Sequence, residues 1–320
     1  MSDSEPQVEK QCGLSDNESQ VGRQDGIIDP VLLSIAIIWG ANFPVYKRLL
    51  DDIPAVGLLA VRFIAMTSIL LVILWASGRL RRNPRAMWLP MFLAGVLVMG
   101  AQQMTFVLGL DRTASGEGAL LFSTAPIFVA LIVAITGSEL ISRANWLGVI
   151  AAFAGVALVI MGGSSVADAP ETRIFGDILM LVSSVGYALF MVISKGLMRK
   201  YGALKVVTFS YMFGGLVVVP MGWGDIVSMD WSALPTLSWL CLGWLIMLSG
   251  VYGFTAWYWR ISLTSPARVA VYQYIVPVVA MITAAVWLGE RPTLWQMSGA
   301  AVVLSGLALA RRRTVAACVD

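Results

Sequence analysis

The sequence contains no histidine, and only 13% of its residues are charged. Without histidine, the chain lacks the most common catalytic base, a common metal ligand and the usual pH switch. Its three cysteines, Cys12, Cys241 and Cys318, lie far apart, so no disulfide framework is indicated. Gly-rich phosphate loops and clusters of metal ligands are also missing from the sequence, so we expect neither an enzyme nor a cofactor, and no use of ATP.

Apolar residues fill most of the chain. They make up 58% of its 320 residues, and the mean hydropathy is +0.80, whereas soluble domains are roughly 45–50% apolar and about 25% charged. The composition therefore predicts an all-α integral membrane protein. Ten apolar segments could each cross the bilayer, at about 31–50, 54–78, 88–110, 117–138, 145–163, 176–195, 204–223, 237–259, 267–288 and 294–310.

Most of the basic residues fall in connections that are expected on one side of the membrane. With the N-terminus placed in the cytoplasm, 16 of the 22 lysines and arginines fall on the inner side and five on the outer side, while Arg62 lies within a span. By the positive-inside rule, we expect a multi-pass protein of the cell (inner) membrane with both termini cytoplasmic. The first 29 residues carry seven acids and two basic residues and are expected to form a disordered polar tail.

The second half of the chain repeats landmarks of the first half. A shift of 151 places Pro126 on Pro277, Glu139 on Glu290, Ser142 on Thr293, Gly148 on Gly299 and Gly155 on Gly306, and a shift of 150 places Gly100 on Gly250 and Thr105 on Thr255. A unit of five helices crosses the membrane an odd number of times, so the two copies must be inverted, as in many carriers. Glu139 and Glu290 then mark equivalent helix junctions, where we favour capping of free backbone amides over proton coupling.

The repeat divides the chain into five parts. They are a polar tail over 1–29, a first five-helix repeat over 30–163, an outer linker over 164–175, a second five-helix repeat over 176–311 and a cytoplasmic tail over 312–320.

The motifs "WGANF", "RF" and the doubled "P-x12-E-x8-G-x6-G" resemble the drug/metabolite transporter superfamily of the EamA type. The resemblance spans residues 31 to 310. It implies a secondary carrier for small metabolites, often an exporter, with a central cavity lined chiefly by helices 1, 3, 4, 6, 8 and 9. A passive channel or facilitator for small polar solutes is the alternative, because it would share the symmetry and lack only obligatory alternation. The expected partners are a small molecule and the lipid bilayer, with no nucleic acid.

Polar and aromatic residues follow helical spacing on the cavity-forming segments. Gln102 and Tyr252 are repeat mates in mid-helix, which favours a shared cavity over ordinary packing or interfacial anchoring. The candidate substrate-binding residues are Trp39, Asn42, Phe43, Gln102, Thr105, Phe106, Tyr187, Tyr252, Thr255, Trp259 and Tyr274. Tyr46 continues the stripe of the first helix, and Gln273 accompanies Tyr274. Since few fixed charges are expected there, the ligand should be neutral or zwitterionic, such as an amino acid, whereas a phosphorylated sugar would call for paired basic residues.

Four further residues carry expectations about motion and coupling. Pro126 and Pro277 fall inside apolar segments, where each is expected to form either a hinge or a static kink. Arg62, within the second span, needs a partner or water unless it reaches a headgroup, and Glu117 is the partner we expect. Arg62 and Glu117 are therefore candidates for a coupling site or gate.

Overall fold

The computed structural model describes residues 29–81, 85–135, 143–161, 170–263, 269 and 271–311. These residues are helical with short connections, and the part of the chain described contains no β-strand. The main elements in chain order are α2 (Pro30–Leu50), α3 (Ala55–Ala76), α4 (Trp88–Leu93), η4 (Ala94–Gly100), α5 (Ala101–Arg112), α6 (Ser115–Phe122), α7 (Ala125–Ile135), α8 (Arg143–Met161), α9 (Pro170–Tyr201), α10 (Ala203–Ser228), α11 (Thr236–Gly243), η6 (Trp244–Phe254), α12 (Thr255–Leu263), η7 (Val271–Tyr274), α14 (Ile275–Trp287) and α15 (Leu294–Arg311). Short 3-10 turns, η2 (Arg79–Arg81), η3 (Arg85–Met87) and η5 (Trp231–Ala233), lie in the connections.

Several expectations fall on residues outside these ranges. They are the polar tail up to residue 28, the first half of the linker (164–169), the tail over 312–320, and Glu139 with Ser142.

Six of the described helices are long and apolar enough to cross a membrane. They cover Pro30–Leu50, Ala55–Ala76, Trp88–Arg112, Glu171–Tyr201, Ala203–Ser228 and Thr236–Leu263, and two shorter apolar helices cover Tyr272–Trp287 and Leu294–Ser305. The apolar segments expected at 117–138 and 145–163 correspond to α6 with α7 and to α8. The all-helical membrane architecture predicted from composition is thus the one observed.

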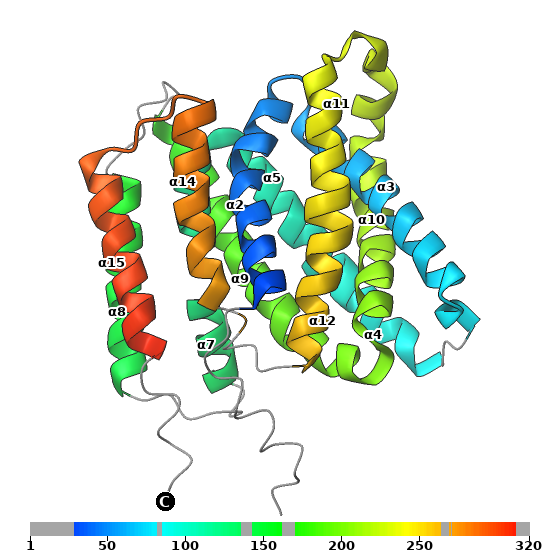
Figure 1. The fold of residues 1–320 in the computed structure, drawn as a ribbon, viewed down its shortest axis with the longest axis horizontal. Helices are drawn as coiled ribbons and strands as arrows, with labels where there is room; N and C mark the ends of the chain where they lie inside the picture. The colour runs from blue at the N-terminus through cyan, green and yellow to red at the C-terminus, as the bar shows by residue number, and fades with distance from the viewer. Residues whose placement is uncertain are drawn as a thin grey trace, which may run out of the picture.

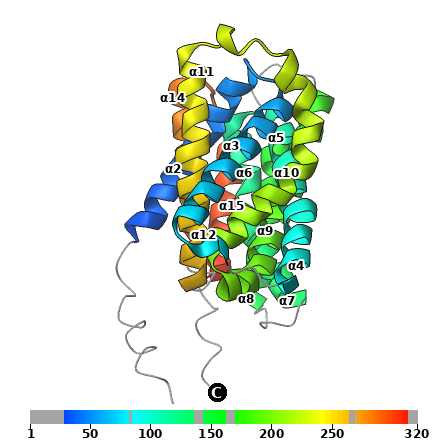
Figure 2. The same cartoon turned by 90° about the vertical axis from the view of Figure 1, so that its right-hand side faces the viewer.

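The helices stand side by side, and helices from distant parts of the sequence pack as pairs (Figures 1 and 2). The α8–α15 pair lies at one side of the bundle and the α3–α10 pair at the other, with α2, α5, α9 and α14 between them. We call the end that contains Asp29 and the last turn of α15 the terminal end, and the end that contains Asp52 and Glu290 the distal end.

Two stretches of wide π-helix occupy matching positions. η4 begins at Ala94 and η6 begins at Trp244, which is 150 residues further on. A π-helix has hydrogen bonds between residues i and i+5. Its rotation per residue therefore differs from that of an α-helix, and short π-helical stretches are frequent at functional sites. The two stretches differ in length, because η4 ends at Gly100 whereas η6 continues to Phe254.

Two helices are also interrupted at matching positions. α6 ends at Phe122 and α7 begins at Ala125, while η7 ends at Tyr274 and α14 begins at Ile275. Pro126 and Pro277 therefore lie in the first turns of α7 and α14, where a missing backbone N–H costs little. Both prolines therefore lie near the start of a helix and not in its interior, where we expected them, and a role of either one as a hinge stays a prediction.

Glu290 caps a helix of the other half of the chain. Its carboxylate accepts hydrogen bonds from the backbone N–H of Ser115 at 2.9 Å and of Gly116 at 3.1 Å, and from the Ser115 hydroxyl. These amides are the free donors at the start of α6, which a negative charge satisfies well. The expected amide capping is therefore present, but it acts across the distal end of the bundle and not on the helix that follows Glu290.

The helix after Glu290, α15, has its own cap. The backbone N–H of Thr293 donates to Gln296 Oε1 at 3.0 Å, and the backbone N–H of Gln296 donates to Thr293 Oγ1 at 3.2 Å. This reciprocal pair is a capping box. Because it satisfies the start of α15, Glu290 is available to α6.

A second polar connection at the distal end joins the α2–α3 loop to α11. The Ser238 hydroxyl donates to Asp52 Oδ2, and Arg48 Nη1 donates to the same oxygen at 3.0 Å. The Ser238 hydrogen bond, assisted by Arg48, holds the pKa of the Asp52 carboxyl below its usual range. The start of α11 is thus tied to the end of α2.

Helices α8 and α15 approach most closely at two glycines. A Cβ atom on Gly155 would lie 2.7 Å from the Gly299 carbonyl oxygen, and a Cβ atom on Gly299 would lie 2.7 Å from the Gly155 carbonyl oxygen. Small residues allow this approach, which is a common way for helices to associate within a membrane.

We predict that Gly155→Val lowers the stability of the purified protein by at least about 1–3 kcal/mol, because the added atoms force the two backbones apart. Thermal unfolding in detergent measures the effect. Gly243→Val is the matched control, since a Cβ atom there meets nothing within 4 Å. Equal melting temperatures for the two variants would show that the glycine contact does not hold α8 against α15.

Candidate functional site

A cavity lies at the centre of the bundle, between helices from both halves of the chain. Its volume is about 50 Å³, which is smaller than the roughly 300–1,000 Å³ of typical small-molecule sites. The lining residues are Trp39, Asn42, Phe43, Tyr46, Arg62, Gln102, Gln103, Phe106, Phe122, Ser123, Tyr187, Phe254, Gln273 and Val276. They come from α2, α3, α5, α6, α9, η6, η7 and α14, and from the break between α6 and α7.

Aromatic rings form a continuous wall around part of the cavity. Phe106 packs against Phe43 at 5.5 Å and against Phe122 at 5.3 Å between ring centres, and Phe122 continues to Tyr187 at 5.3 Å. Trp39 follows, 6.5 Å from Tyr187. Such edge-to-face contacts hold rings in fixed positions and present both ring faces and ring edges to a ligand.

Polar groups on α2 are held by the π-helix η6. The Trp39 indole donates to the Ser249 carbonyl oxygen at 3.2 Å, and the Asn42 side-chain amide donates to the Ser249 hydroxyl. Asn42 Oδ1 also accepts from the Trp244 indole at 3.1 Å. The Ser249 carbonyl, in the middle of η6, thus accepts a hydrogen bond from a side chain of α2. The sequence "WGAN" is thereby fixed against Ser249.

Glutamines form a second polar group on the opposite side of α2. Gln103 Nε2 donates to Gln102 Oε1 at 3.0 Å, and Gln102 Nε2 donates to the Ser183 hydroxyl of α9 at 2.9 Å. Gln273 of η7 donates to the Tyr187 hydroxyl at 2.8 Å. These side chains are buried, so each bond both satisfies a polar atom and sets the direction of an amide.

Arg62 lines the cavity and does not contact Glu117. Its Nη1 donates to Gln103 Oε1 at 2.8 Å and to the Tyr46 hydroxyl, and its side chain is buried. The expected Arg62–Glu117 pair was wrong. Glu117 lies at the start of α6 near the distal end, whereas Arg62 lies in the second turn of α3 and is drawn to the polar atoms of α2 and α5.

Glu117 instead belongs to a buried cluster with α9. Arg173 Nη2 lies 3.7 Å from Glu117 Oε1, and Arg173 Nε lies 3.6 Å from Asp177 Oδ2. The Thr113 hydroxyl donates to Asp177 Oδ1 at 2.7 Å. Two carboxylates with fully buried side chains therefore share one guanidinium, and burial makes such an excess of negative charge costly.

Comparison with known proteins assigns the chain to a family. Its sequence matches the EamA-like transporter family over residues 27–161 and again over residues 174–312. The chain belongs to the EamA-like transporter family. The family and the names of its relatives are those of transporters and not of enzymes.

Individual relatives of this EamA-like protein cover nearly all of its helical region. An uncharacterized transporter of Archaeoglobus fulgidus is 26% identical over 281 residues, covering 85% of this chain and 93% of the relative. The "Probable terminal-alkyne amino-acid exporter" of Streptantibioticus cattleyicolor is 28% identical over 287 residues, covering 89% and 93%. A solved crystal structure superposes with a TM-score of 0.62 at 17% sequence identity, covering 87% of this chain and 94% of the other, which supports the fold.

In this EamA-like transporter, six of the eleven candidate substrate-binding residues line the cavity. They are Trp39, Asn42, Phe43, Gln102, Phe106 and Tyr187. The other five, Thr105, Tyr252, Thr255, Trp259 and Tyr274, are not among the lining residues.

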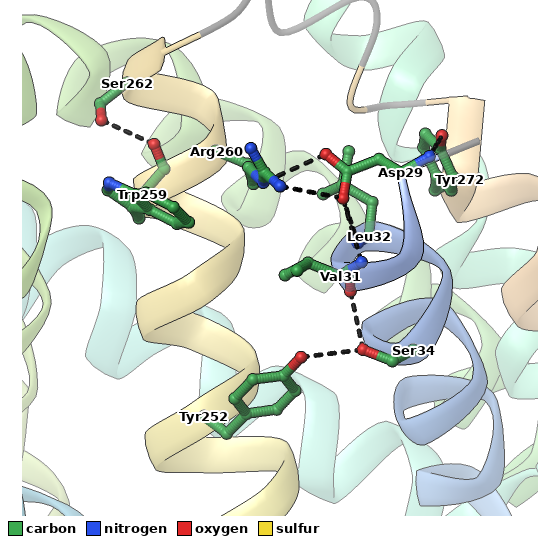
Figure 3. Close-up of polar contacts among 9 residues, drawn as sticks. All are labelled: Asp29, Val31, Leu32, Ser34, Tyr252, Trp259, Arg260, Ser262 and Tyr272. Carbon is green, nitrogen blue, oxygen red and sulfur yellow. Dashed lines mark hydrogen bonds and ion pairs between the residues drawn. The ribbon is translucent and has the colours of Figure 1, made fainter. Parts of the chain in front are cut away.

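The five remaining residues lie elsewhere for physical reasons. The Thr105 hydroxyl donates to carbonyls of its own helix, at 3.0 Å from both Ala101 O and Gln102 O. Tyr252 and Trp259 are partly exposed on the outside of the bundle, and the Tyr252 hydroxyl bonds Ser34 of α2 at 2.9 Å (Figure 3). Thr255 and Tyr274 are half-buried, in α12 and at the end of η7.

The length of η6 explains why Tyr252 does not match Gln102. Residue 102 lies in an α-helix after η4 has ended, whereas residue 252 is still within the π-helix η6. The two copies therefore turn through different angles before reaching these positions, and a shift of 150 no longer preserves the face.

Sequence reasoning missed Gln103, Phe122, Ser123, Phe254 and Val276 as lining residues. Gln103 was detectable because it adjoins Gln102, and Phe122 and Ser123 because they precede the proline of α7. Phe254 had no usable signal, since its position depends on the π-helix.

Proposed function

We propose that this protein is a secondary carrier that exports a small neutral or zwitterionic metabolite, such as an amino acid, by alternating access. We further propose ten membrane spans in two inverted halves, over 30–163 and 176–311. The protein would lie in the cell (inner) membrane with both termini in the cytoplasm. The double family match supports two copies, as do the π-helices that begin 150 residues apart and the helix breaks before Pro126 and Pro277.

The packing of the helices supports a two-fold relation between the two halves. In the first half, α5 and α7 each pack against α9 of the second half. Correspondingly, η6 and α14 of the second half each pack against α2 of the first half. α3–α10 and α8–α15 each pair a helix with its own counterpart. Inverted halves can exchange conformations, which opens a central site first to one side of the membrane and then to the other.

The central cavity is the observation that carries the proposal. Amides from α2, α5 and η7 face a wall of rings, so the site offers both hydrogen bonds and apolar contact. The relative from Streptantibioticus cattleyicolor, whose name is that of an amino-acid exporter, is consistent with this chemistry. We therefore choose an amino acid as the substrate because of the cavity lining, and export as the direction because of the name of this relative.

Counterflow separates a carrier from the alternative, a passive channel or facilitator. Proteoliposomes loaded with an unlabelled apolar amino acid should accumulate the labelled form transiently against its gradient, because a carrier must exchange its bound ligand. A channel equilibrates the label and gives no overshoot.

We predict that Asn42→Ala and Gln102→Ala weaken binding of that amino acid by roughly two- to tenfold, the loss of about 0.5–1.5 kcal/mol for one hydrogen bond. Binding to purified, folded protein is the measurement. Tyr252→Phe is the matched control, because its hydroxyl bonds Ser34 outside the cavity. If Tyr252→Phe weakened binding as much as the other two variants, the site would have to be placed elsewhere.

Polar contacts at the terminal end are suited to act as the gate of the carrier that we propose. Asp29 forms a two-point ion pair with Arg260 of α12, with Nε 3.1 Å from Oδ2 and Nη2 3.2 Å from Oδ1 (Figure 3). Its backbone N–H donates to the Tyr272 hydroxyl at 2.8 Å, and its carboxylate caps the start of α2. We propose that these contacts close the terminal end and must separate in each transport cycle.

Cross-linking tests this gate. In a chain with Cys12, Cys241 and Cys318 replaced by serine, Asp29→Cys with Arg260→Cys should be joined by a short bis-methanethiosulfonate reagent. We predict that joining them abolishes counterflow and that a reducing agent restores it. The Asp29→Cys single variant, treated in the same way, controls for simple modification. Full counterflow in the joined protein would mean that α2 and α12 do not separate there.

Glu117 remains our candidate for proton coupling, now together with Asp177. Arg173 can balance only one of the two carboxylates, and Glu290 adds a further negative charge at the start of α6. A buried acid that lacks a full counter-charge favours its protonated form, so this group is suited to bind and release one proton.

We predict that counterflow depends on pH in the wild type and that Glu117→Gln removes much of that dependence. Asp111→Asn is the control, since Asp111 is an exposed acid paired with Arg112. Unchanged pH dependence in Glu117→Gln would exclude Glu117 as the proton carrier.

A further inference from the structure

Arg62 is a buried cation with no acidic partner in the described part of the chain. Its side chain is 2% exposed, and none of the ion pairs among the described residues includes it. Both of its hydrogen bonds leave from Nη1 and go to neutral groups, and its Nε has no hydrogen-bond partner. A charge in the interior of a membrane protein is costly and is usually matched by an opposite charge, so a functional role is the default explanation.

The guanidinium is held in a fixed position. Its carbon lies 5.5 Å from the centre of the Tyr46 ring and 5.9 Å from the centre of the Phe254 ring. Gln103, which accepts from Nη1, is itself fixed by Gln102, and Gln102 by Ser183. Contacts of this kind position an arginine without neutralising it.

The arrangement leaves one edge of Arg62 for a ligand. The Nε and Nη2 atoms of arginine form a fork that matches the two oxygens of a carboxylate. The same chain uses this edge elsewhere, since Nε and Nη2 of Arg260 hold the two oxygens of Asp29. Arg62 is one of the residues that line the cavity, and its Nε is buried there without a hydrogen-bond partner among the described residues.

We infer that Arg62 is the anchor for a substrate carboxylate, so that the carrier recognises amino acids and other monocarboxylates with an apolar or aromatic body. This inference rests on the proposed function and narrows its substrate class. The remainder of such a ligand packs against Phe106, Phe122 and Tyr187, which lie around the same cavity. A ligand with two negative charges is disfavoured, because the lining residues that the structure describes include one arginine and no lysine.

A series of matched ligands tests the inference on the wild-type protein. Leucine, methionine, phenylalanine and tryptophan are each compared with their carboxamide and with the amine that lacks the carboxyl group, by ligand-induced stabilisation against heat. 3-Phenylpropionate tests whether the carboxylate suffices without the amino group. We expect each acid to bind roughly tenfold or more tightly than its amide, as for hydrogen bonds to a charged group. Equal stabilisation by acids and amides, or none by any acid, would overturn the inference.

Variants at residue 62 then locate the effect. Arg62→Gln should reduce the acid-to-amide preference to about one, and Arg62→Lys should retain part of it, because lysine keeps the charge and loses the fork. Arg112→Gln, which removes an arginine at the distal end, should leave the preference unchanged. Retention of the full preference in Arg62→Gln would also contradict the inference.

The proposed function and this inference can fail separately. Counterflow of any ligand by the wild type supports a carrier, whatever its preference for acids. A carrier that exchanges amides as well as acids would refute the anchor alone, whereas acid-specific binding without counterflow would refute the carrier alone. If Arg62→Gln does not fold, the ligand series on the wild type still decides the question.

Discussion

Every polar group in the interior of this bundle has to find its partner inside the protein, because lipid offers none. That constraint accounts for several contacts between distant helices. The Trp39 indole donates to the Ser249 carbonyl of η6. The free amides at the start of α6 donate to Glu290 from the other half of the chain. Against this background, the unmatched charges stand out. Arg62 lacks an acid in the described residues, and Glu117 with Asp177 exceeds the single charge of Arg173.

The two halves contribute unequally to the cavity. Asn42, Arg62, Gln102 and Gln103 come from the first half, while the second half supplies Tyr187, Phe254, Gln273 and Val276. The arginine of the cavity lining therefore comes from the first half alone, whereas we propose that the surrounding helices follow two-fold symmetry. A carrier needs symmetry for its conformational exchange, but recognition of a polar ligand needs one orientation. Divergence of side chains over a repeated backbone meets both requirements.

The sequence predicted the backbone better than the side-chain environment. Matched prolines, glycines and glutamates indicated the repeat. Helical spacing placed Trp39, Asn42 and Phe43 on one face, and all three line the cavity. Nothing in the sequence signalled the π-helices, which rotate Tyr252 out of register with Gln102. Contacts between distant helices were equally hidden, so both the target of Glu290 and the partners of Arg62 required the structure. Position along one helix does not specify which other helix lies opposite.

The two ends of the bundle differ in what it costs to open them. At the terminal end, the side chains of Asp29 and Arg260 are 22% and 26% exposed, and an ion pair near water contributes only about 0–1 kcal/mol. Separating it exposes both groups to solvent that can hydrate them. At the distal end, Glu117 and Asp177 are fully buried around Arg173, and removing one member of a buried charge group costs roughly 3–5 kcal/mol. Moving α9 away from α6 would therefore leave a carboxylate without its counter-charge unless that carboxylate first took up a proton. In the carrier mechanism that we propose, a proton bound at Glu117 or Asp177 would lower this barrier, so we propose that opening of the distal end is the step linked to protonation.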